Sequence, residues 1–80
     1  MSERLEKIAG IISWIQNMSR HNATFGDVAL EFDVFGTLTK EEFYEAKKLL
    51  QKKSYVGSYD PNVAWEKRIV AFKKEMGDNR

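Results

Sequence analysis

The chain has 80 residues, of which 42% are hydrophobic and 31% charged, with a formal net charge of +1 and no cysteine. A chain of this length predicts one domain, spanning residues 1–80, with a limited core. The balance of apolar and charged residues argues against disorder, and the absence of cysteine excludes disulfides and thiolate metal sites.

The charge is distributed unevenly along the chain. Residues 1–39 hold three Lys/Arg against five Asp/Glu, a balance of −2, and residues 40–80 hold ten against seven, a balance of +3. This basic bias is milder than the footprint of a typical nucleic-acid binder. No apolar run approaches the roughly 18 residues of a membrane span, and the first residues lack a signal-peptide cleavage site. We therefore expect a cytoplasmic protein with no membrane partner.

The first predicted helix covers residues 3–19 and has two adjacent apolar stripes. One consists of Leu5, Ile8, Ile12 and Ile15, and the other of Ile11, Trp14 and Met18. A face this wide predicts a central core helix that is contacted from two sides. The alternative is that Ile11, Trp14 and Met18 form a surface for a protein partner or a homodimer.

A second, short helix is predicted over residues 25–31, after an N-cap at Thr24 with Asp27 three residues later. The segment LEFDVF also alternates apolar and polar residues, so an extended piece over residues 30–35 is an alternative. We prefer a helix that runs into a loop, with Gly36 as the turn residue.

The clearest helix is predicted over residues 39–53. Thr39 and Glu42 have the spacing of a capping box, and Leu38 and Phe43 that of a hydrophobic staple. Glutamates lie in its first turns and lysines in its last, which complements the helix dipole. Its polar face is therefore expected to point outward.

The segment SYVGSY favours extended structure, with the option of a short β segment near residues 55–59. Asp60 and Pro61 then predict the start of a fourth helix that ends near Met76. Its apolar face is best explained by core packing; an interfacial membrane helix, with basic residues opposite that face, is the weaker alternative. Residues 78–80 are expected to be a frayed tail. The apolar face is formed by Trp65, Ile69, Phe72 and Met76, and the opposing basic residues are Lys67, Arg68, Lys73 and Lys74.

Taken together, these elements predict an all-α, four-helix compact domain. Motifs for chemistry are absent from the sequence: the single histidine, His21, lies in a polar break, and neither a phosphate-binding glycine pattern nor a metal-ligand spacing occurs. We therefore expect no catalytic residue, no cofactor and no metal.

The order of the elements resembles that of winged-helix and helix-turn-helix DNA-binding domains. The resemblance rests on IISWIQ as the first core helix, TFGDVALEF as the second, TKEEFYEAKKLLQKK in the place of a recognition helix and SYVGSY where a wing strand would start. It implies a helix-turn-helix-like core and a small DNA-binding accessory or transcription-regulatory protein that contacts double-stranded DNA. The residues implied to lie nearest bases or phosphates are Thr39, Lys40, Tyr44 and Lys47, and those implied to supply charge to the phosphates are Lys48, Lys52 and Lys53. The alternative for these lysines is a solvated helix face.

A second function of another class is also open. Near-neutral charge, two tryptophans and three tyrosines suit a protein-interaction module, such as a helical adaptor or inhibitor of the phage or plasmid type.

Overall fold

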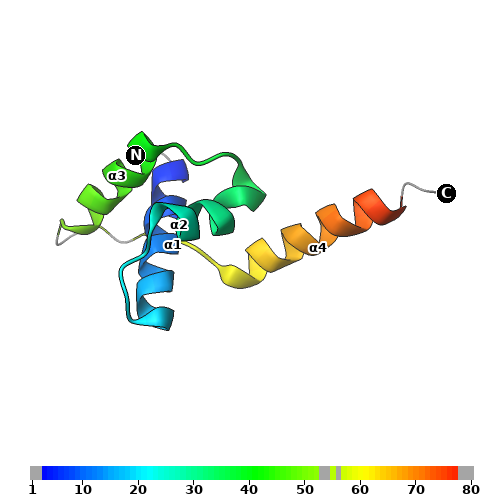
Figure 1. Ribbon diagram of the computed structural model, residues 1–80, viewed down its shortest axis with the longest axis horizontal. Helices are drawn as coiled ribbons and strands as arrows, with labels where there is room; N and C mark the ends of the chain where they lie inside the picture. Colours follow the sequence, from blue (N-terminus) through cyan, green and yellow to red (C-terminus); the bar gives the residue numbers. More distant parts are fainter. Residues whose placement is uncertain (1–2, 53–54, 56, 78–80) are drawn as a thin grey trace.

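Helices joined by short connections make up the computed structural model, which describes residues 3–52, 55 and 57–77. The elements are α1 (Glu3–Ser19), α2 (Phe25–Phe32), the short 3-10 helix η1 (Asp33–Phe35), α3 (Lys40–Leu50) and α4 (Pro61–Gly77). No strand occurs among the described residues, and the all-α, four-helix fold class is confirmed. Figure 1 shows α1, α2 and α3 gathered into one body, while α4 extends from it as an arm.

Helix α1 is the centre of the body, because both α2 and α3 pack against it. Its side chains Ile8, Ile11 and Ile12 are at most 1% exposed. Phe32 of α2 and Phe43 of α3 close the core from the two other helices. The prediction of a core helix contacted from two sides is therefore confirmed.

Both predicted capping boxes form. The Thr24 hydroxyl accepts from the Asp27 amide, and the Thr39 hydroxyl accepts from the Glu42 amide, with each acidic side chain accepting from the amide of its threonine. Local hydrogen bonds of this kind satisfy amides that have no partner inside the helix. They explain why α2 and α3 begin where the sequence predicts.

The start of α3 is also tied to α1 by Arg4. The Arg4 Nε donates to Glu42 Oε2 at 2.7 Å, and one terminal nitrogen donates to Glu42 Oε1 at 2.9 Å and to the Thr37 carbonyl at 2.8 Å. The Arg4 hydrogen bond, together with those from Thr39, lowers the pKa of Glu42 to about 2. This carboxylate therefore connects α1 to the start of α3, and Arg4 also holds the chain just before it through the Thr37 carbonyl.

The end of α3 differs from the expected one, and one expected alternative is overturned. The helix predicted over residues 39–53 forms over Lys40–Leu50, with Thr39 as its N-cap. Gln51 and Lys52 form a turn and a bend, and Lys53 lies outside the described residues. The extended alternative for residues 30–35 is wrong, because this segment completes α2 and then forms η1.

Residues 57–59, which precede α4, cross over α1. The described residues of 55–59 form no strand, and Val56 and Ser54 lie outside the description. The Ser58 amide donates to the Glu6 carbonyl at 3.0 Å. A Cβ placed on Gly10 would lie only 2.5 Å from the Ser58 carbonyl carbon, so glycine allows this close backbone approach.

Among the described residues, the contacts that attach helix α4 to the body lie near its first turns. Ala64 is 2% exposed, and Arg68 donates to Glu31 Oε1 at 3.3 Å and to the Leu30 carbonyl at 2.7 Å. The Lys67 ammonium lies 4.6 Å from the centre of the Phe35 ring. The rest of the helix extends outward, which gives the molecule extents of 51 × 25 × 20 Å.

The expectation that the apolar face of α4 packs into the core is wrong. Trp65 is 61% exposed and Phe72 64% exposed. Packing fails because the body offers no surface beyond the first turns of the arm (Figure 1). Within the described part of the chain, no helix has the length and apolar character needed to cross a bilayer.

Candidate nucleic-acid interface

The outer side of α3 carries the residues expected to contact DNA. Its inner side is fixed by Phe43, 4% exposed, and Ala46, 0% exposed, which bury against α1. At about 100° per residue, positions 40, 44, 47, 48 and 51 lie together on the side that adjoins the buried one, with Phe43 next to position 47. This stripe of lysine, tyrosine and glutamine contains no acidic residue.

Solvent reaches most of the predicted contact residues. Lys40, Lys48 and Lys52 are exposed, and Tyr44 is 58% exposed. Lys47 is half-buried because its ammonium lies over the ring of Phe43, 5.3 Å from the ring centre. Of the predicted residues, Lys40, Tyr44, Lys47 and Lys48 therefore lie on one helix face. Lys52 lies in the bend after α3, and Lys53 falls outside the described residues.

The lysines of α3 differ from two arginines of the chain in how they are paired. Arg4 and Arg68 form salt bridges to Glu42 and Glu31, at 2.7 and 3.3 Å. Within the described residues, no ion pair ties the lysines of α3 to a carboxylate. These ammonium groups can therefore bind an external anion without first breaking an internal salt bridge.

Thr39 was expected to lie near bases or phosphates, but its side chain is engaged in capping α3. Its hydroxyl accepts from the Glu42 amide at 3.2 Å and donates to Glu42 Oε1 at 3.0 Å. Both of its hydrogen-bonding roles thus serve the N-cap of α3. Its part in any interface is to position the first turn of the helix.

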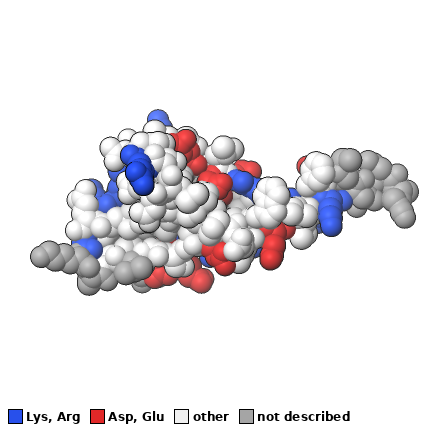
Figure 2. Space-filling model, turned by 90° about the horizontal axis from the view of Figure 1, so that it is seen from below, with Lys and Arg blue, Asp and Glu red and all other residues white. Residues whose placement is uncertain are grey.

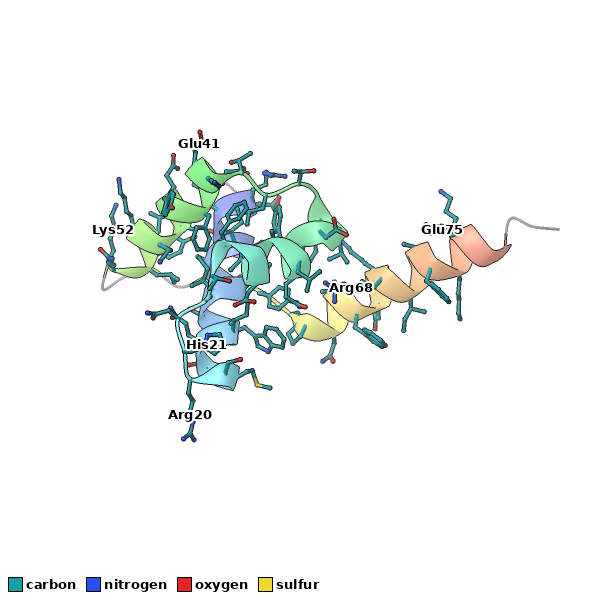
Figure 3. All side chains as sticks on the ribbon, in the orientation of Figure 1. Arg20, His21, Glu41, Lys52, Arg68 and Glu75 are labelled. Atoms are coloured by element: carbon teal, nitrogen blue, oxygen red, sulfur yellow. The ribbon has the colours of Figure 1, made fainter. Side chains whose placement is uncertain are left out.

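The basic stripe is narrow and has acidic neighbours. Glu41 and Glu45 are exposed on α3 beside it. Figure 3 shows Glu41 and Lys52 at opposite ends of α3, and Arg20 beyond the end of α1, well away from both. In Figure 2, seen from below, blue and red side chains are interspersed. Any DNA contact would therefore be confined to α3 and would not extend over a broad basic surface.

The three residues of the alternative partner surface do not form one exposed patch. Ile11 is 0% exposed, so it contributes to the core and cannot touch a partner. Trp14 is half-buried, with its ring 5.5 Å from that of Tyr59 in an edge-on arrangement. Only Met18, 69% exposed, lies open at the end of α1.

Tyr59 was not singled out from the sequence, yet it joins the arm to the body. Its hydroxyl donates to Glu31 Oε2 at 3.1 Å. Burial, followed by the negative charge of Glu31, raises the pKa of Tyr59 to about 12. The sequence predicted extended structure for SYVGSY but could not reveal this contact with α2.

The apolar face of α4 is exposed, whereas the sequence analysis expected it to pack into the core. A hollow on this face is lined by Trp65, Arg68, Ile69 and Phe72, and no other element of the described chain contributes to it. The spacing of these residues was visible in the sequence, but the absence of a packing partner was not.

No group of three or more His, Asp or Glu side chains in the described residues could hold a metal ion. Comparisons of the chain with models of protein families, with curated proteins and with solved structures found no match.

Proposed function

We propose that the protein is a small, non-catalytic DNA-binding domain with an accessory or regulatory role, and that the outer face of α3 contacts double-stranded DNA. The observation that supports this most is the set of exposed α3 lysines, which make no ion pair within the described residues. Tyr44 lies in the middle of the same face and is 58% exposed.

We propose different tasks for the two ends of this face. Lys40 and Tyr44 lie in the first turns of α3, the part of a recognition helix that reaches base edges in the major groove. Lys48 lies in the last turn of α3 and Lys52 just after it, where their ammonium groups would pair with phosphates and add affinity without reading sequence. Arg4 would keep the helix start in place through Glu42.

The test measures the binding of the full chain to a labelled DNA duplex. Fluorescence anisotropy of the duplex gives the affinity at each of a range of salt concentrations. Affinity should fall steeply from low to moderate salt, because phosphate contacts release counterions. Lys48→Ala should weaken binding and reduce the slope of log affinity against log salt by about 1, the value for one lost phosphate contact.

The matched control is Lys74→Ala, which removes the same charge from an exposed position on α4. It should leave the salt slope unchanged. Absence of association even at low salt would refute the proposal. Equal effects of the two variants would show that only the net charge matters, and would remove α3 as the contact surface.

The second candidate is the protein-interaction module, and one observation favours it. The arm exposes Trp65 and Phe72, which are 61% and 64% exposed. Large aromatic residues are enriched at the centres of protein interfaces. The location differs from the one expected from the sequence, since it lies on α4 and not on α1.

A further inference from the structure

The apolar face of α4 is a stripe that no other element of the described chain covers: Trp65 and Phe72 are more than half exposed and Ile69 between them is half-buried. Trp65, Ile69 and Phe72 follow one another at intervals of four and three residues, and in the sequence Met76 comes four residues later. Alternating intervals of four and three place side chains on the seam between two paired helices. Solitary apolar side chains on a surface need no explanation, whereas a contiguous patch marks an interaction site.

The outer part of α4 also lacks the packing that normally stabilises a helix. Its last described side chains, Phe72, Lys73, Lys74 and Glu75, are all exposed. Figure 3 shows Glu75 near the tip of the arm, far from the body. Most helical stability in proteins comes from packing of an apolar face, so a second helix against this stripe would supply what the body does not.

The charges that flank the stripe indicate what the second helix is. Glu66 and Lys73 border it on one side, and Arg68 and Glu75 on the other. Each pair has opposite signs seven residues apart, which is about 10 Å along the helix axis. These partners are too distant to pair within their own helix, and Glu66, Lys73 and Glu75 have no ion pair with any residue that the structure describes.

An antiparallel second copy of the same helix brings these charges together. With Ile69 opposite Phe72 of the second copy, Glu66 lies beside the second copy's Lys73, and Arg68 beside its Glu75. The twofold symmetry of such a pair makes each contact twice. A parallel pair would instead place Arg68 beside Lys73, which is repulsive.

From this complementarity we propose that α4 is a self-association surface, on which a second copy of the chain docks antiparallel along Trp65, Ile69 and Phe72. The pairing places the tip of each arm beside the base of the other, with the two bodies at opposite ends. Arg68 keeps its bonds to Glu31 and Leu30, since a guanidinium has five donors. The pairing does not depend on whether α3 binds DNA.

The first experiment measures the mass of the full chain by sedimentation equilibrium over a range of concentrations. The wild type should shift from one to two copies as concentration rises. Phe72→Glu should raise the dimer dissociation constant by at least about 30-fold, the size of a hot-spot effect. Val70→Glu is the control, because Val70 is also 65% exposed but lies on the other side of the helix. It should leave the dimer intact.

The second experiment tests the antiparallel register by charge exchange. Glu66→Lys should weaken the dimer about fivefold, because it puts lysine beside lysine at two symmetric places. Lys73→Glu should weaken it similarly, and the double variant Glu66→Lys/Lys73→Glu should restore the wild-type dissociation constant. Circular dichroism of each variant checks that the helices remain, since all the changed residues are exposed.

A monomer at every concentration would overturn the proposal, as would a double variant no better than the single ones. Disruption by Val70→Glu equal to that by Phe72→Glu would also overturn it. Binding of the monomer to vesicles of anionic lipid, lost in Phe72→Glu and without a dimer in solution, would assign the face to a membrane surface instead.

Discussion

The body and the arm each contain a helix with an apolar stripe, but the stripe is buried in the body and exposed on the arm. In α1, Ile8 and Ile12 are at most 1% exposed, because α2 and α3 cover them. In α4, Trp65 and Phe72 are more than half exposed, because nothing in the described chain covers them. The helical spacing of apolar residues therefore identifies a face that needs a packing partner. It does not indicate whether that partner lies in the same molecule.

The largest expected difference between body and arm is the loss of stability when one phenylalanine is removed from each. Phe32→Ala empties a site that is 0% exposed and should lower the free energy of unfolding by about 3–5 kcal/mol. Phe72→Ala, at 64% exposure, should change it by less than about 0.5 kcal/mol at concentrations where the chain is monomeric. Urea unfolding followed by circular dichroism measures both. Similar losses would mean that the arm is packed in solution.

A second test addresses the close approach between Gly10 of α1 and the backbone of Ser58, which precedes α4. Gly10→Ala adds a methyl group that would lie 2.5 Å from the Ser58 backbone, so that backbone must shift and stability should fall by about 1–3 kcal/mol. The control is Gly26→Ala in α2, where the nearest atom is the Thr24 hydroxyl oxygen at 3.9 Å. Alanine favours a helix over glycine, so this control should be neutral or slightly more stable. A stabilising Gly10→Ala would contradict the close approach.

The smallest expected effect is on how the free energy of unfolding depends on pH, and it arises in the body. The Arg4 guanidinium helps to hold the pKa of Glu42 at about 2, below its ordinary 4.5. Because the pKa of the folded state is the lower one, the stabilisation is present above pH 4.5 and is lost as the pH falls toward 2. Arg4→Gln should therefore reduce the loss of stability over this acid range, measured by urea unfolding at a series of pH values. Lys74→Gln, the same charge change on the arm, should leave it as in the wild type; parallel curves for all three proteins would exclude the contribution of this pair.

The helices and their caps were predictable because the signals for them are local. Thr24 with Asp27 and Thr39 with Glu42 form capping boxes within four residues of chain, and proline at position 61 starts α4 as expected. The lysines of α3 could likewise be placed on an outer face, since Phe43 and Ala46 define the inner one. Local hydrogen bonds and helical periodicity need no knowledge of the rest of the chain.

The attachment of one element to another was not predictable in this way. The salt bridge from Arg4 to Glu42 spans 38 positions, and the Tyr59 hydroxyl reaches Glu31 across 28. Sequence spacing carries no information about such pairs. For the same reason, the candidate surface on α4 was assigned to the core, although its four apolar positions were recognised.

By itself, the amino-acid sequence determined the helical class, the helix starts and the apolar side of each helix, because these depend on interactions between near neighbours in the chain. Only the tertiary structure decided that α1 is enclosed, that Ile11 is inaccessible and that α4 leaves its aromatic side chains in solvent. Burial depends on which surfaces meet, and surfaces meet through contacts between residues far apart in the sequence.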